Sequence, residues 1–321
     1  MLKPGADIVL SIVIPVFNEE DNINHLIDRL ESVLRPMDVQ YEIILVNDGS
    51  RDKTWERIKA AASVNKNLKG VCLCRNFGHQ HALLAGLHSA CGKAVISMDG
   101  DLQHPPEMIP ALFDAWKDGY KIVNTYREDV EVTGFFKRIT SKYFYKFFSS
   151  MTNVPMAAGS SDFRLIDRAV IASLAEFRDV DLFLRGAINW IGYPTIVIPF
   201  KAEKRFTGES KYNLKKMMKF AVGAIVSFSV KPLMLAALVG AITSSLAFLE
   251  ILYVLIQFFR GATVAGWTSI VAIMSFLFGV LFLILGIIGV YLSRIHQALQ
   301  GRPQFIIADY VNFDSRLPGS E

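Results

Sequence analysis

The chain has 321 residues, of which 52% are hydrophobic and 20% are charged, and its formal net charge is +4. This composition excludes a disordered or collagen-like chain, and it is too apolar for one ordinary soluble domain because of an excess between residues 232 and 292. The small net charge provides no strong basic field, so a nucleic-acid partner is not expected.

Strands and helices alternate in the first part of the chain. Residues 8–15 form a continuous apolar, β-branched run of strand length, and residues 22–34 carry apolar residues at helical spacing. Further strands are predicted at residues 41–47, 70–75 and 94–98, and a helix at residues 54–62. This repetition predicts an α/β fold with a mostly parallel sheet that is covered by helices on both faces.

Polar residues follow each of the predicted strands. They are Asn18 and Glu19, Asn47 and Asp48, Arg75 and Asn76, and Asp99 and Asp101. Ligands of open parallel sheets bind beyond the carboxyl ends of the strands. The sequence therefore predicts the active cleft at this edge of the sheet.

Two common phosphate-binding motifs do not fit this pattern. No G-x-G-x-x-G turn follows the first strand, which argues against a nicotinamide-binding domain. Residues 86–93 resemble a P-loop, but the glycines are one residue too far apart and Ala94 stands where a Ser or Thr would bind magnesium.

The three cysteines, Cys72, Cys74 and Cys91, do not make a disulfide framework and indicate a reducing compartment. A zinc site with nearby histidines is an alternative, but the spacings fit no common finger, so we favour buried thiols. No cleavable signal peptide is expected, because only a short apolar run follows Lys3.

Asp99, Gly100 and Asp101 form the most informative triplet. Two carboxylates separated by one residue can hold a hard divalent cation, and the small glycine allows a diphosphate to approach. Gln103 adds a neutral oxygen ligand nearby. A solvated acidic loop is the alternative, but the position after an apolar strand favours metal binding.

Residues 134–148 interleave aromatic residues with Lys and Arg in a predicted helix. This pattern is typical of a helix that lies in the headgroup region of a bilayer. Packing of the same helix on the sheet is the alternative.

Two long apolar segments follow, at residues 233–259 and 267–292, and each is long enough to cross a hydrocarbon core of about 30 Å. Lysines precede the first segment and Arg294 and Arg302 follow the second, so the positive-inside rule places both termini and the catalytic part in the cytoplasm. A pair of buried core helices is the alternative. Glu250, inside the first segment, is expected to meet a neighbouring subunit or a water rather than act as a relay.

Five motifs resemble those of family 2 inverting glycosyltransferases in their order and spacing. They are Pro15-Val-Phe-Asn-Glu19, Asn47-Asp-Gly-Ser50, Asp99-Gly-Asp-Leu-Gln-His-Pro-Pro-Glu107, Ser161-Asp-Phe-Arg-Leu165 and Arg205-Phe-Thr-Gly-Glu-Ser-Lys-Tyr212. The likeness covers nearly the whole chain. It is greatest to the polyprenyl-phosphate enzymes, which include dolichol-phosphate mannose synthases, and segments 75–79, 181–186 and 302–303 resemble the bactoprenol glucosyltransferase branch.

The resemblance implies a glycosyltransferase type A catalytic domain, Rossmann-like with a mostly parallel sheet, followed by two transmembrane helices. It divides the chain into a nucleotide-sugar-binding core at residues 1–130, an acceptor-side region at 131–231, a transmembrane hairpin at 232–293 and a cytoplasmic tail at 294–321.

The resemblance also implies roles for individual residues. Contacts to the uracil and ribose of the donor are expected from Pro15, Phe17, Glu19 and Asp48. Mg²⁺ or Mn²⁺ would be held by Asp99, Asp101 and Gln103, and a loop closing over the donor phosphates would contain Arg205, Ser210 and Lys211. Asp162 is expected near the reacting centre, and the candidates for the acceptor phosphate are Arg127, Arg138 and Arg164.

The implied reaction moves one sugar, with glucose favoured, from a UDP-sugar to undecaprenyl or another polyprenyl phosphate, with inversion. The Q-x-x-R-W motif of processive synthases is absent, which agrees with transfer of a single sugar. The enzyme is expected in the cytoplasmic membrane as a homo-oligomer, with a separate flippase as partner. The alternatives are another sugar, such as an aminoarabinose derivative or mannose, or a non-catalytic role in lipid-sugar transport.

Overall fold

The computed structural model describes residues 8–128, 160–177, 183–201, 231–260 and 266–313. The chain divides into two compact units, which we describe separately. The first contains the sheet and the residues after 302, and the second contains two long helices.

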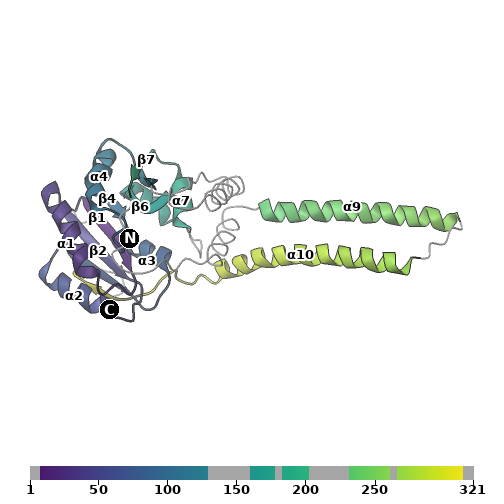
Figure 1. Cartoon of the computed structure of the whole chain (residues 1–321), viewed down its shortest axis with the longest axis horizontal. Helices are drawn as coiled ribbons and strands as arrows, with labels where there is room; N and C mark the ends of the chain where they lie inside the picture. Colours follow the sequence, from purple (N-terminus) through teal and green to yellow (C-terminus); the bar gives the residue numbers. More distant parts are fainter. Residues whose placement is uncertain (1–7, 129–159, 178–182, 202–230, 261–265, 314–321) are drawn as a thin grey trace. The chain divides into compact units, whose positions relative to one another are not determined.

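Four parallel strands form the centre of the sheet. They are β1 (Leu10–Val16), β2 (Tyr41–Asn47), β3 (Leu68–Leu73) and β4 (Ala94–Ser97), in the spatial order β4-β1-β2-β3. Figure 1 labels β1, β2 and β4. β1 is buried along its whole length, because neighbouring strands and helices cover it on all sides. The mostly parallel α/β sheet predicted from the sequence is therefore confirmed, with strand ends shifted by one or two residues.

Strand β6 (Ser160–Asp167) runs antiparallel between β4 and β5 (Ile122–Arg127), and β7 (Thr195–Phe200) pairs with β5 at the outer edge. We call the edge at which β1 to β4 end the carboxyl edge. Because β6 is reversed, its first residues lie at the carboxyl edge, and Ser97 at the end of β4 pairs with Arg164. The start of β6 thus comes next to the residues that follow β4.

Helices cover both faces of the sheet. Helices α1 (Ile23–Leu34), α2 (Thr54–Val64) and α4 (Ile109–Lys117) contribute to the core on one face. Helix α3 (His79–Ser89) packs against β1 and β2 on the other face, where Gly86 faces Val13 and Val46. Two shorter helices follow β6, α6 (Arg168–Leu174) and α7 (Leu184–Ile191).

The last strand, β8 (Ile307–Val311), pairs antiparallel with β3. Asn312 then donates its side-chain amide to the carbonyl oxygens of Ala62 and Leu68, at 2.6 and 2.8 Å. Part of the segment 294–321, expected as a cytoplasmic tail, therefore adds a strand at the edge of the sheet. A five-residue strand gives little periodic signal, and its pairing depends on a partner more than 200 residues earlier in the chain.

The second unit contains α9 (Lys231–Phe259) and α10 (Trp267–Leu299), which pack against each other. The stretches Lys231–Leu249 and Phe276–Leu299 are long and apolar enough to cross a membrane, and they are almost wholly unburied. Both helices coincide with the predicted spans, and α10 continues beyond the predicted end. The expectation for Glu250 concerns a side chain that lies outside the described part of the structure.

Asp167, at the end of β6, forms hydrogen bonds with α4, with the residue before β5 and with the start of α6. Its Oδ2 accepts hydrogen bonds from Trp116 Nε1 at 2.7 Å and Lys121 Nζ at 2.9 Å, and its Oδ1 accepts from the backbone N–H of Ala169 at 2.9 Å. Burial disfavours the charge, but these donors outweigh it and hold the pKa of Asp167 below its ordinary value.

Replacing Asp167 with Asn tests this charge. A depressed pKa stabilises the fold above the unfolded pKa of about 4, and the contribution is lost as the pH falls through the folded pKa. We expect Asp167→Asn to lower the free energy of unfolding by about 1–3 kcal/mol at neutral pH and by less at about pH 3, measured by thermal unfolding. Asp114→Asn, at an exposed position of α4, is the control and should change little. Equal losses at both pH values would show that the charge of Asp167 is not responsible.

Candidate active site

Residues 99–103, which we call the acidic turn, begin two residues after the end of β4. Gly100 packs against the end of β1, because a Cβ at this position would lie 2.9 Å from Val16 Cγ1. The backbone of Leu102 is left-handed, with φ of 60°, and the backbone N–H of Gln103 donates to Asp101 Oδ1 at 3.2 Å. The turn is therefore tight and lies directly against the carboxyl edge.

Asp162, at the start of β6, is the centre of a buried ionic cluster beside this turn. Arg185 of α7 binds it bidentately, with Nε 2.6 Å from Oδ1 and a terminal nitrogen 2.8 Å from Oδ2. Arg164 also donates to Oδ1 at 3.2 Å, and Gln80 of α3 donates to Oδ2 at 3.4 Å. The side chain of Asp162 is only 7% exposed. Its oxygens are thus held by four donors from three elements.

These contacts determine the charges of the cluster. Burial alone would favour the neutral acid, but Arg185 above all, with smaller contributions from His79 and Arg164, holds the pKa of Asp162 well below its ordinary value. Burial lowers the pKa of Arg164 to about 10, so its guanidinium is still charged at neutral pH. Asp162 is accordingly a firmly ionised counter-ion for two arginines.

His79, the first residue of α3, connects Asp162 to the acidic turn. Its Nε2 lies 3.6 Å from Asp162 Oδ2 and 3.4 Å from Asp99 Oδ1. Burial disfavours its charge, but the two carboxylates outweigh this effect and raise the pKa of His79. Residues from β4, β6, α3 and α7 therefore converge on one place at the carboxyl edge.

The acidic turn fits a divalent cation on its donor chemistry. Asp99 Oδ1 is buried without a hydrogen-bond partner, which leaves an anionic oxygen available for a cation. No group of three or more His, Cys, Asp or Glu side chains among the described residues forms a complete metal site. Mg²⁺ is ordinarily bound by one or two carboxylates and completed by substrate phosphates and water, so Asp99 and Asp101 suffice for that mode.

A hollow of about 380 Å³ lies at the ends of β1, β2 and β3. Its lining includes Phe17, Asn18, Gly49, Arg51, Cys74, Arg75 and Asn76. Of the four residues expected to contact the nucleoside, only Phe17 is in this lining. Pro15 lies within β1, and the Glu19 carboxylate accepts a hydrogen bond from the Asn22 side chain at 2.5 Å.

Asp48, which is also expected to contact the donor, makes hydrogen bonds within the fold. It is 3% exposed, and its two oxygens accept the backbone N–H groups of Phe77 and Gly78 at 2.8 and 3.0 Å. Burial raises the pKa of Asp48, although these hydrogen bonds and the nearby histidines oppose the shift. In this structure the carboxylate holds the loop that leads into α3, and through it the position of His79.

The predicted phosphate-binding residues fall into three groups. Arg127 ends β5, at the carboxyl edge, and is half-buried. Arg164 is instead 3% exposed and paired with Asp162, so it is part of the cluster and does not lie on an open surface. Arg138, Arg205, Ser210 and Lys211 lie outside the described residues, and their roles stay predictions.

Sequence reasoning missed His79, Gln80, His104 and Arg185 as members of this site. Arg185 lies in the segment 181–186, which was noted for its resemblance and given no role. His79 is the last residue of the segment 75–79, which also carried the resemblance without a role, and Gln80 follows that segment. The cysteines also differ in part from expectation, because Cys91 is buried but Cys74 is exposed.

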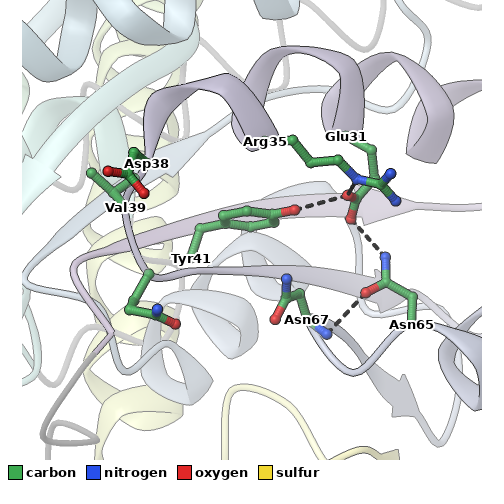
Figure 2. Close-up of a pocket in the computed structure, with 8 residues that line it drawn as sticks. Glu31, Arg35, Asp38, Val39, Tyr41, Asn65 and Asn67 are labelled. Atoms are coloured by element: carbon green, nitrogen blue, oxygen red, sulfur yellow. Dashed lines mark hydrogen bonds and ion pairs between the residues drawn. The ribbon is translucent and has the colours of Figure 1, made fainter.

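A second hollow, of about 400 Å³, lies at the opposite edge of the sheet, where β2 begins (Figure 2). Glu31 is one of its lining residues and accepts hydrogen bonds from Arg35, Tyr41 and Asn65 at 2.6–2.8 Å. This carboxylate is therefore already satisfied by neighbouring side chains. The hollow is separate from the chemistry at the carboxyl edge.

Comparison with known proteins identifies the family. The family model described as Glycosyl transferase family 2 matches residues 11–174, which include β1, the acidic turn and β6. The chain belongs to this family. The expected resemblance is thereby confirmed for the catalytic domain.

Several relatives of this family 2 protein match almost its whole length. An uncharacterized glycosyltransferase of Synechocystis sp. is 41% identical over 94% of this chain and 95% of its own. A prophage bactoprenol glucosyl transferase homolog of Escherichia coli is 33% identical over 93% of this chain and 98% of its own. A bactoprenol glucosyl transferase of Shigella phage SfII is 34% identical over 93% of this chain and 97% of its own.

Solved structures of glycosyltransferases are also similar in fold. A mannosyltransferase from Pyrobaculum calidifontis, in complex with GDP-Man and Mn²⁺, has 18% identity and a TM-score of 0.49, covering 71% of this chain and 65% of its own. TarS of S. aureus, in complex with UDP-GlcNAc, has 17% identity and a TM-score of 0.48, covering 68% of this chain and 66% of its own.

Arg185 offers a direct test of the cluster. Arg185→Ala removes two charge-assisted hydrogen bonds from the buried Asp162, so we expect glycosyl transfer to fall about 100-fold, with Arg185→Lys intermediate. If Arg185 and Asp162 act as one unit, the double variant with Asp162→Asn loses less than the sum of the two single losses, measured as kcat/KM. Fully additive losses would contradict the pairing.

Proposed function

We propose that this enzyme transfers one glucose from UDP-glucose to undecaprenyl phosphate, or another polyprenyl phosphate, with inversion at the anomeric carbon. The observation that carries the proposal is the site itself, where an acidic turn lies beside a carboxylate already held by two arginines. Relatives named bactoprenol glucosyl transferases support the acceptor and the sugar, since they match the chain over its catalytic domain and both apolar helices.

The reaction requires alignment more than proton transfer. A polyprenyl phosphate is already anionic at neutral pH, so its oxygen can attack the anomeric carbon without a strong general base. Asp162 suits this chemistry as a positioning group, because its low pKa and its four donors make it a poor base. It holds Arg185 and His79 where negative charge gathers during the transfer.

The acidic turn is the proposed binding place for Mg²⁺ or Mn²⁺ on the donor diphosphate. Asp99 and Asp101 would hold the cation, with Gln103 as the additional neutral ligand proposed from the sequence. When bound, the cation offsets the charge of the departing UDP. Contacts to the nucleoside are proposed in the hollow lined by Phe17 and Arg75.

The acceptor phosphate is proposed to approach the carboxyl edge from the side of β5, where Arg127 ends the strand. Arg138 is the second candidate for this phosphate, and Arg205, Ser210 and Lys211 are proposed for the donor phosphates. The side chains of Arg205, Ser210 and Lys211 end in guanidinium, hydroxyl and ammonium groups, which all donate hydrogen bonds to phosphate oxygens.

The two apolar helices and the charges that flank them support a membrane location. We propose a multi-pass protein of the cytoplasmic membrane, with the catalytic domain and both termini in the cytoplasm. The lipid tail of the acceptor then stays in the bilayer. A homo-oligomer and a separate flippase stay predictions.

Purified full-length protein in lipid vesicles tests the proposal directly. With undecaprenyl phosphate and UDP-glucose, we expect a glucosyl lipid whose anomeric configuration is opposite to that of the donor. GDP-mannose and a UDP-aminoarabinose donor are the comparison, and faster transfer from either would change the assigned sugar. No transfer from any donor, with accelerated movement of a preformed glucosyl lipid across the vesicle, would favour the transport alternative.

The metal is tested with Asp101→Ala. We expect turnover to fall about 100-fold or more, because a single carboxylate holds a divalent cation weakly, while thermal unfolding changes little. Asp114→Ala, at an exposed position of α4, is the matched control and should keep full activity. Undiminished turnover of the unaltered enzyme in excess EDTA would contradict a metal requirement.

A further inference from the structure

His104 follows the acidic turn and is buried, with 6% exposure. Its imidazole stacks on the ring of Phe163, with centroids 5.2 Å apart and planes at 14°, and meets the edge of Phe200 at 5.7 Å. These rings belong to β6 and β7. Packing from two strands therefore fixes the plane of the imidazole.

The two ring nitrogens have different partners. Nδ1 lies 3.0 Å from the backbone nitrogen of Asp99, and Nε2 lies 2.8 Å from Ser161 Oγ. A backbone N–H can only donate, so Nδ1 must be the unprotonated nitrogen and Nε2 carries the hydrogen.

The acidic turn needs such support from outside. Leu102 is buried and adopts a left-handed conformation, which is unfavourable for a residue with a side chain. Asp99 begins this turn, and its backbone N–H is bound by His104, while its Oδ2 lies 3.6 Å from His104 Nε2. His104 thus acts on the backbone that sets the direction of the first carboxylate.

We propose that His104 is a positioning residue for the acidic turn, fixing Asp99 through Nδ1 and connecting the turn through Nε2 to Ser161, the neighbour of Asp162. The inference rests on the proposed function in one respect, namely that the turn holds a divalent cation together with UDP. His104 itself binds neither. Its loss should therefore weaken cation binding without removing the hollow for the nucleoside.

Two variants of His104 with amide side chains distinguish the role of Nδ1 from the role of Nε2. His104→Asn places an amide oxygen near the position of Nδ1 and can still accept from Asp99, whereas His104→Gln places its amide near Nε2 and cannot. The measurement is the affinity of the full-length protein in detergent for Mn²⁺ in the presence of UDP, from the electron paramagnetic resonance signal of free Mn²⁺. We expect His104→Gln to weaken Mn²⁺ binding about tenfold or more and His104→Asn to weaken it much less.

His88→Gln is the control, because His88 lies at the far end of α3 and contacts Phe305. It should bind Mn²⁺ like the unaltered protein. Equal affinity of both His104 variants and the unaltered protein, or a greater loss in His104→Asn than in His104→Gln, would overturn the proposal. If the unaltered protein itself does not bind Mn²⁺ with UDP, the metal part of the proposed function fails instead.

A second measurement needs no variant. Nitrogen NMR shifts of ¹⁵N-labelled imidazoles distinguish a protonated from an unprotonated ring nitrogen. His104 is the only histidine of the chain that precedes a proline, so a labelled His carbonyl–Pro nitrogen pair identifies its signals. An unprotonated Nδ1 and a protonated Nε2 are expected, and the opposite tautomer would overturn the proposal even if neither variant folds.

Discussion

The site depends on one buried charge. Asp162 is almost enclosed, and an ionised carboxylate in such a place is strongly unfavourable unless it is paired and hydrogen-bonded. Arg185 and Arg164 satisfy it, and Arg164 is itself so buried that it needs Asp162 in return. This mutual requirement joins β6 to α7 at the carboxyl edge. With Asp99 and Asp101 the cluster holds three carboxylates, and its basic members are Arg164, Arg185 and His79.

A second constraint is the close approach of α3 to the sheet. A Cβ on Gly86 would lie 2.2 Å from Val13 Cγ1 and 2.9 Å from Val46 Cγ2, so only glycine allows this distance. The approach brings His79, at the start of α3, to Asp99 and Asp162. Asp48 fixes the same helix start from β2 by accepting two backbone N–H groups. The geometry of the site is therefore built from backbone packing as much as from its polar side chains.

The sequence was informative where the signal is local. Apolar β-branched runs predicted β1, β2 and β4, and polar residues after them located the site, because neither inference needs knowledge of a distant partner. Arg185 and β8 were missed because each acts through a contact with a residue far away in the chain. Asp48 shows the intermediate case, since its type and place were recognised while its partners, two backbone groups 29 and 30 residues later, were not.

The state of Asp162 also bears on the chemistry of the acceptor. A sugar or other hydroxyl acceptor must lose a proton during transfer, and a base for that step needs a pKa near the working pH and a free lone pair. Asp162 has neither, because Arg185 and its other donors occupy both oxygens and depress its pKa. An acceptor that is already ionised removes the need for a base, and it benefits from guanidinium groups held rigidly by a counter-ion. The state of Asp162 thus suits an acceptor that is already ionised.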